Sequence, residues 1–210
     1  MKIIKSALIG VISTVLVNAA AADELPGLFV NLMERAKMTF TMPEGYEPVE
    51  LIDNPHMNYE YALKHANRQV EVRYAIRPVD SMLLMHKKYL EDPQDIFQTL
   101  EPNEMFHISQ SMAIAANITG IMDLTELNDK AIGDSFPEES VKREFGADSG
   151  TFAVFRQIMK EFTQDYQCCM ILSLWKKDLG SAYYFILFDD LPQDEIEECL
   201  RSIFYTLKFE

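Results

Sequence analysis

The sequence predicts a mixed α+β protein in which helices cover both faces of an antiparallel β-sheet, an α/β/α sandwich. Residues 59–65 and 70–77 alternate apolar and polar side chains, as the two strands of a hairpin do. Residues 151–158, 167–175 and 182–188 are apolar at both sets of alternate positions, so these strands need cover on two sides. Segments of helical periodicity before and after them can supply that cover.

Composition and charge limit the classes of protein to consider. The chain has 210 residues, of which 48% are hydrophobic, which excludes a disordered or collagen-like chain. It carries 19 Lys and Arg against 33 Asp and Glu, a formal net charge of -14. Binding to nucleic acid or to an anionic membrane rests on clustered basic residues, so neither is expected as a partner.

The first 22 residues have the layout of a bacterial secretory signal peptide. Lys2 and Lys5 precede an apolar run, 7–17, and small residues follow at Ala19 to Ala22. The run is too short to cross a bilayer comfortably, so we expect cleavage before Asp23 rather than a retained anchor. The prediction is a single domain, 23–210, in the periplasm or secreted, with no membrane insertion after cleavage.

The start of the predicted domain combines a short helix with two extended segments. Apolar residues at helical spacing predict the helix, namely Leu28, Leu32 and Met33. Residues 38–42 are expected to form a strand that ends at a turn of Pro43, Glu44 and Gly45. A second strand is expected at 47–52.

The predicted hairpin has one apolar and one polar face. Residues 66–69 supply the loop, in which Asn67 would tolerate a positive φ. Arg68, Arg73 and Arg77 are expected on the solvated face.

The periodicity becomes helical between residues 80 and 120. Two apolar faces are expected, the first formed by Met82, Met85 and Tyr89, and the second by Met105, Ile108, Met112 and Ala115. Gly120 fits a helix stop. Ser135 to Glu138 then has the layout of a capping box, before a short helix with Val141 and Phe145 that ends at Gly146.

The last third contains three two-sided strands and a closing helix. The turn at 178–181 makes the last two strands antiparallel neighbours. Asp190, followed by Gln193, is expected to open the helix. Its apolar stripe consists of Ile196, Cys199, Leu200 and Ile203, and residues 205–209 close the chain in extended form.

This order of elements resembles the PsbP-like and DcrB-like proteins. The resemblance rests on the sequence Met-Pro-Glu-Gly-Tyr at 42–46, the hairpin, the strands led by Thr151 and Phe152, and Leu207-Lys208-Phe209 after the last helix. Where the family commonly has Trp, this chain has Tyr46, and its middle segment, 82–120, is longer. The resemblance implies a non-enzymatic secreted or periplasmic module that binds or supports larger assemblies, without catalytic residues to carry over.

The sequence contains no catalytic or nucleotide-binding motif that we recognise. It has no Walker-type loop, no Gly-x-Ser-x-Gly elbow and no His-Glu-x-x-His. The four histidines, His56, His65, His86 and His107, have irregular spacing, and we interpret them as polar surface or sheet residues.

Three cysteines in an oxidising compartment allow one disulfide. Cys168 and Cys169 are adjacent on a strand and point to opposite faces, so they do not readily bond to each other. Our hypothesis is a bridge from Cys199 to either of the pair. The alternative is that all three are small buried hydrophobic residues.

Two groups of residues raise the question of a metal. Met82, Met85 and His86 carry thioether and imidazole ligands that suit Cu(I), although Met at helical spacing is more often core filler. Four acidic residues are better explained by the start of a helix than by a hard cation, namely Asp189, Asp190, Asp194 and Glu195. We therefore predict no cofactor and no assigned metal or catalytic residue.

Two classes of function stay open from the sequence. The first is a non-enzymatic periplasmic or secreted binding or accessory protein that acts through a surface of the sandwich, with another envelope protein as its partner. The alternative is a periplasmic copper handler or a hydrolase whose site is assembled from distant residues, with His86, His107 and the methionines as the pointers.

Overall fold

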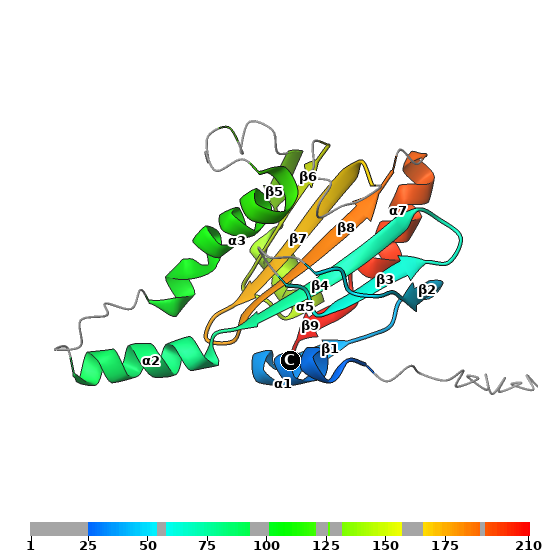
Figure 1. Ribbon diagram of the computed structural model, residues 1–210. Helices are drawn as coiled ribbons and strands as arrows, with labels where there is room; N and C mark the ends of the chain where they lie inside the picture. The colour runs from blue at the N-terminus through cyan, green and yellow to red at the C-terminus, as the bar shows by residue number, and fades with distance from the viewer. Residues whose placement is uncertain are drawn as a thin grey trace, which may run out of the picture.

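The fold is mixed α+β and is built on one large antiparallel sheet (Figure 1). The computed structural model describes residues 25–53, 58–92, 101–120, 126, 132–156, 166–189 and 192–210. The expected signal peptide, 1–22, and the expected helix cap Asp190 lie outside these residues. The prediction of an α+β protein around an antiparallel sheet is confirmed.

The large sheet has the strand order β2-β3-β4-β8-β7-β6-β5, and every neighbouring pair is antiparallel. Its strands are β2 (Tyr46–Pro48), β3 (Tyr61–His65), β4 (Val70–Pro78), β5 (Ile132–Ser135), β6 (Ser149–Phe155), β7 (Cys168–Lys176) and β8 (Gly180–Phe188). A separate two-stranded sheet pairs β1 (Met38–Phe40) with β9 (Leu207–Phe209), beside α1 (Figure 1).

The helices connect and flank these strands. They are α1 (Gly27–Ala36), α2 (Asp80–Glu91), the 3₁₀ turn η1 (Pro102–Met105), α3 (Phe106–Ile114), the π-helical turn η2 (Ala115–Thr119), α5 (Glu138–Phe145) and α7 (Gln193–Ile203). α2 extends away from the sheet and buries none of its side chains (Figure 1). None of the helices described is both long enough and apolar enough to cross a lipid bilayer.

The large sheet separates two hydrophobic cores. The α7-side core contains Phe29, Val141 and Ile203 from three helices, together with one set of alternate strand residues such as Tyr74 and Leu172. The α3-side core contains the opposite set, for which Ala75, Ile171, Tyr183 and Phe185 are examples, and it is joined by Phe106, Ile114 and Ile118. The apolar residues on both faces of β7 and β8 are therefore buried, as predicted.

The hairpin β3–β4 forms as predicted, but its expected polar face is not solvated. Arg73 has only 1% of its surface exposed, and Glu60 and Glu71 are also buried. Tyr59 covers this face, and its ring lies 5.0 Å from the Arg73 guanidinium. The expectation that Arg73 faces water is therefore wrong, because a segment that precedes β3 in the chain folds over the sheet.

In two helices, some of the buried residues differ from those that the sequence predicts. In α1, Leu28 is exposed and Phe29 is buried instead. In α3, Ile108 and Met112 are exposed, whereas Phe106 and Ala113 are buried. Ile108 and Met112 lie one turn apart, so much of the apolar face predicted for α3 is exposed.

The start of α5 also differs from its prediction. Ser135 belongs to β5 and does not cap the helix, and the N-cap position is Pro137, which has no side chain to accept a hydrogen bond. The helix still buries Val141 and Phe145, and it ends at Gly146 in the left-handed region, as predicted.

The end of the chain is fixed to the sheet by buried polar contacts. The Tyr184 hydroxyl donates to the Leu207 carbonyl at 3.1 Å, and the Leu207 amide donates to the same hydroxyl at 2.9 Å. The Tyr74 and Thr206 hydroxyls lie 3.0 Å apart. The predicted closing strand is thereby held against the α7-side core, where Cys199 and Ile203 of α7 are buried as expected.

Candidate functional site

A largely apolar pocket lies against the α3 face of the sheet and is here named the α3 pocket. Its volume is about 380 Å³, within the range of small-molecule sites. Its walls come from the end of β4, the first turn of α2, η1, α3 and the turn-proximal ends of β7 and β8. The lining residues are Arg77, Pro78, Val79, Met82, Pro102, Met105, Phe106, Ser109, Met112, Ala113, Trp175, Ser181 and Tyr183.

The sheet register places Trp175 and Tyr183 side by side in the floor of this pocket. Trp175 pairs with Ser181, and Tyr183 pairs with Ser173 across β7 and β8. Side chains two residues apart on a strand share a face, so Trp175 and Tyr183 are diagonal neighbours on the α3 side.

The upper wall consists of methionines and an aromatic ring. Met82, Met105 and Met112 come from three different helical elements and line the same space. The Phe106 ring stacks on Trp175, with 6.0 Å between the ring centres. Methionine side chains are flexible and polarisable, so this wall can adapt to ligands of different shape.

Hydrogen bonds fix the helical wall to the sheet. Asn103 of η1 donates from Nδ2 to Asp178 Oδ1 at 2.9 Å, and its Oδ1 accepts from the Asp178 amide at 2.8 Å. Gln110 of α3 donates to the Ser173 hydroxyl at 3.1 Å and also to Thr151. The pocket is therefore held open by contacts at both ends of its helical wall.

Two polar atoms beside the pocket are shielded from solvent, Trp175 Nε1 and Tyr183 Oη. Among the described residues, Trp175 Nε1 has no hydrogen-bond partner. An unsatisfied buried polar group costs about 1–3 kcal/mol, so such groups are uncommon in folded proteins. Burial raises the pKa of Tyr183 to about 12, against the opposing effects of Ser181 and Arg77. Tyr183 therefore keeps its proton at neutral pH.

The charge of Arg77 at the pocket is already compensated. Its Nη1 donates to Glu60 Oε1 at 2.8 Å, and its Nη2 donates to the Asn58 carbonyl. Glu60 is buried and also accepts from the Ile76 amide at 2.9 Å. Burial raises the pKa of Glu60, whereas the Arg77 charge and these hydrogen bonds lower it. Arg77 and Glu60 thus form a closed ion pair at the edge of the pocket.

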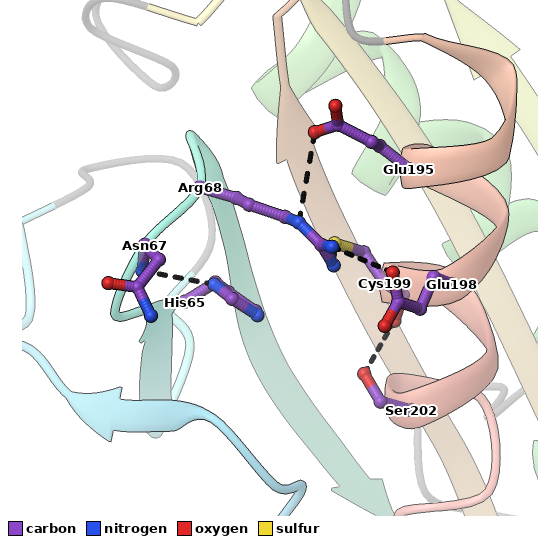
Figure 2. A network of polar contacts seen from close by, with 7 residues as sticks. All are labelled: His65, Asn67, Arg68, Glu195, Glu198, Cys199 and Ser202. Atoms are coloured by element: carbon purple, nitrogen blue, oxygen red, sulfur yellow. Dashed lines mark hydrogen bonds and ion pairs between the residues drawn. The ribbon is translucent and has the colours of Figure 1, made fainter.

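A second, polar cleft of about 760 Å³ lies on the other side of the sheet, between the hairpin and α7 (Figure 2). Arg68 crosses it and donates to Cys199 Sγ at 3.4 Å and to Glu198 at 2.7 Å, and it lies 3.8 Å from Glu195. Hydrogen bonds to Cys199 and Glu198 raise the pKa of Arg68. Arg68, predicted to be solvated, instead joins the hairpin loop to α7.

His65 and Ser202 also make hydrogen bonds within the cleft. His65 Nδ1 accepts from the Asn67 amide at 3.1 Å, and the Ser202 hydroxyl donates to the Cys199 carbonyl at 2.7 Å (Figure 2). Burial and the Arg68 charge lower the pKa of His65. Arg68, Glu195 and Glu198 of this cleft thus bind one another.

The three cysteines are free thiols in the structure. Cys199 belongs to the α7-side core and Cys169 to the α3-side core. Alternation along β7 places Cys168 on the same side as Met170, which is the side of Cys199. The predicted disulfide stays a prediction. A Cys168–Cys199 bridge would join residues on the same side of the sheet, whereas a Cys169–Cys199 bridge would join residues on opposite sides.

The residues considered as metal ligands are only partly brought together. Met82, Met85 and His86 lie within about one turn of α2, where Met82 lines the α3 pocket and Met85 is largely exposed. His107 lies on α3 beside the Phe106 ring. In the described part of the chain, no group of three or more His, Cys, Asp or Glu side chains could hold a metal ion.

The acidic residues near the start of α7 have structural contacts. Asp189 accepts from the Gln167 amide at 3.2 Å, and Glu195 pairs with Arg68. Asp194 lies in the first turn of α7, where a negative charge is favourable. His56 and Asp190 lie outside the described residues.

Comparison with known proteins gives no relative: no family model matches the chain, and neither the curated proteins nor the solved structures contain a significant match.

Proposed function

We propose that the protein is a non-enzymatic binding protein, periplasmic or secreted, that holds an apolar small molecule in the α3 pocket. The observation that carries the proposal is the pocket itself, about 380 Å³ in volume and lined mainly by Met, Phe, Trp and Pro side chains. Sites for small molecules combine such an apolar lining with a few polar groups that orient the ligand. Ser109 and Ser181 are polar residues in this lining.

The wider setting of the proposal comes from the sequence. The layout of residues 1–22 supports export, and the order of elements supports a PsbP-like or DcrB-like α/β/α sandwich that serves another envelope protein. In this architecture helices cover both faces of the sheet, which the helical residues of the two cores support. In this proposal the protein acts through the α3 pocket, which is the part of its surface that binds the ligand.

A fluorescent apolar probe tests the proposal. We expect N-phenyl-1-naphthylamine to bind the purified protein with a rise in its fluorescence. Ser109→Phe would place a ring in the pocket and abolish most of this binding. Ile108→Phe is the matched control, because Ile108 is the preceding residue of α3, is exposed, and does not line the pocket. Circular dichroism would verify that both variants fold.

Two outcomes would contradict the proposal. One is the absence of probe binding to the wild-type protein. The other is equal binding to wild type, Ser109→Phe and Ile108→Phe, which would place the probe elsewhere on the surface.

Binding of Cu(I) is the second candidate function. The observation in its favour is that Met82, Met105 and Met112 line one pocket, and thioethers are soft ligands that select Cu(I). Anaerobic competition with bicinchoninate tests it. If Cu(I) is the ligand, the wild-type protein and the Met85→Leu variant should each withdraw one equivalent of copper from bicinchoninate. The Met105→Leu variant should withdraw none. This result would favour copper over an apolar molecule as the ligand.

A further inference from the structure

We propose that α2 is the interface of a homodimer, in which the α2 helices of two copies of this chain pack side by side and antiparallel. The inference goes beyond the proposed function and does not depend on the ligand of the α3 pocket.

Among the helices described, α2 exposes the largest set of apolar side chains. Leu84, Met85 and Leu90 are each more than half exposed, and Met82 is 39% exposed. The helix buries none of its residues and extends away from the sheet (Figure 1). Exposed apolar side chains gathered on one element are typical of a surface that binds another molecule.

The helix also lacks the features that stabilise a short helix on its own. It has only 12 residues, and its N-cap position, Val79, makes no side-chain hydrogen bond. Isolated helices shorter than about 12–15 residues are marginal in water, and helices in proteins are stabilised mainly by packing of an apolar face. Met82, Met85 and Tyr89 form such a face, because residues three and four positions apart lie on the same side of a helix. A partner that packs on this face would stabilise α2.

The charges of α2 are complementary to those of a second α2. The first turn is acidic, with Asp80, and the last turn is basic, with Lys88. In an antiparallel pair the first turn of each helix lies beside the last turn of the other, so Asp80 of one copy faces Lys88 of the other copy at both ends. The two helix dipoles are then opposed, which also favours this arrangement.

Asp80 can accept Lys88 although it already has a partner. Its carboxylate binds Arg35 at 2.6 Å, and 46% of its side chain stays exposed. A carboxylate has about four lone-pair sites, so a lysine of the second copy can join the pair from the exposed side. Lys88 itself is exposed.

The charge balance of α2 also suits contact between two acidic chains. Each copy has a formal net charge of -14, so most of its surface repels a second copy. α2 has no net charge with His neutral, because Asp80 and Glu91 balance Lys87 and Lys88. It also extends from the sheet, so antiparallel contact through α2 keeps the two acidic domains apart (Figure 1).

Such an interface closes on itself and is small. A twofold axis between the helices places the same residues on both sides, so the assembly stops at the dimer. A helix of this length spans about 18 Å. Because small interfaces belong to weak complexes, we expect a Kd in the micromolar range.

Sedimentation equilibrium of the purified protein over about 1–200 µM measures this association. Met85→Glu places a charge in the apolar interface and should raise the Kd of the dimer at least about tenfold. Leu28→Glu is the matched control, because Leu28 of α1 is 63% exposed, against 59% for Met85. This control should keep the Kd of the wild type. Circular dichroism would verify that each variant folds.

Reversal of one charge tests the antiparallel arrangement. Lys88→Glu would face Asp80 of the other copy with a like charge, and should raise the Kd about fivefold or more. Lys142→Glu, at an exposed position of α5, changes the net charge by the same amount without touching the interface. It should have a much smaller effect.

Four outcomes would overturn the inference. A wild-type protein that stays monomeric over the whole concentration range would exclude the dimer, whether or not the α3 pocket binds N-phenyl-1-naphthylamine. A dimer that Met85→Glu leaves intact would have its interface elsewhere. Equal effects of Lys88→Glu and Lys142→Glu would contradict the antiparallel pairing. A monomer that binds phosphatidylcholine vesicles, with loss of binding in Met85→Glu, would assign α2 to a lipid surface instead.

Discussion

Arg73 Nε donates to Glu71 Oε1 at 2.6 Å within the same strand, and the pair is buried beneath Tyr59. Removal of one partner from a buried ion pair leaves an uncompensated charge and costs about 3–5 kcal/mol. We therefore expect Arg73→Leu to lower the free energy of unfolding by about that amount, as measured by urea denaturation.

Arg143 offers a matched control for this substitution. It pairs with Glu144 at 2.8 Å, but its side chain is 66% exposed. Exposed pairs contribute little, so Arg143→Leu should change the free energy of unfolding by less than about 1 kcal/mol. Similar effects of the two substitutions would show that Arg73 is not buried as described.

The sequence predicts the central sheet well because its signal is local. Alternation identifies β3 and β4, and apolar residues at every position identify β7 and β8, with Trp175 on the same side as Cys169 and Ile171. In contrast, β5 (Ile132–Ser135) was missed, because it is short and exposed and contains Gly and Asp, which are depleted in strands.

The α3 pocket could not be predicted in the same way, because its lining comes from distant parts of the chain. The periodicity of α2 and α3 indicates helices but does not say which face meets the sheet. From the sequence, Met82 and Met105 are expected to fill the core. Only the structure shows that they line a pocket together with Trp175 and Tyr183. The one sequence signal that could have pointed there is the concentration of methionines between residues 82 and 112.

Gly180 ends the tight turn between β7 and β8 beside the pocket. Its φ is +132°, and a Cβ at this position would lie 2.2 Å from the Arg77 carbonyl oxygen. Strain of this kind costs on the order of 1–3 kcal/mol, so Gly180→Ala should lower the midpoint of urea denaturation clearly.

Gly27 provides the comparison for Gly180. A Cβ there meets nothing within 4 Å, and the residue begins α1. Because Ala favours the helix over Gly, Gly27→Ala should leave stability unchanged or raise it by up to about 1 kcal/mol. A Gly180→Ala variant as stable as Gly27→Ala would contradict the described turn.

Cysteine mapping tests where the three thiols lie. Burial raises the pKa of Cys169, which packs away from Cys199 on the other face of the sheet. We expect non-reducing peptide mapping of native protein to recover Cys169 as a thiol that alkylates slowly, and any disulfide to join Cys199 with Cys168. A Cys169–Cys199 peptide would contradict this placement.

The stability of the protein should fall at alkaline pH. Burial is the main cause that raises the pKa of six of the nine tyrosines, namely Tyr46, Tyr59, Tyr74, Tyr166, Tyr183 and Tyr184. In the unfolded chain these groups lose their protons near pH 10, whereas the folded protein retains them. Stability is therefore fully present below pH 10 and is lost as the pH rises from about 10 towards 12.

Absorbance at 295 nm checks this pH dependence when it is followed together with circular dichroism. The exposed tyrosines should ionise first, and the remaining ones should ionise only as the protein unfolds. Ionisation of all nine in one step near pH 10, with an unchanged circular dichroism signal, would contradict the burial described.

The central claim is that an apolar molecule occupies the α3 pocket, and intermolecular NOEs to the Trp175 indole test it most directly. With ethylbenzene bound to the full-length protein, we expect NOEs between its ring protons and the indole protons, and their loss in Ser109→Phe but not in Ile108→Phe. Binding of ethylbenzene without contact to the indole, or with NOEs unchanged in Ser109→Phe, would contradict the claim.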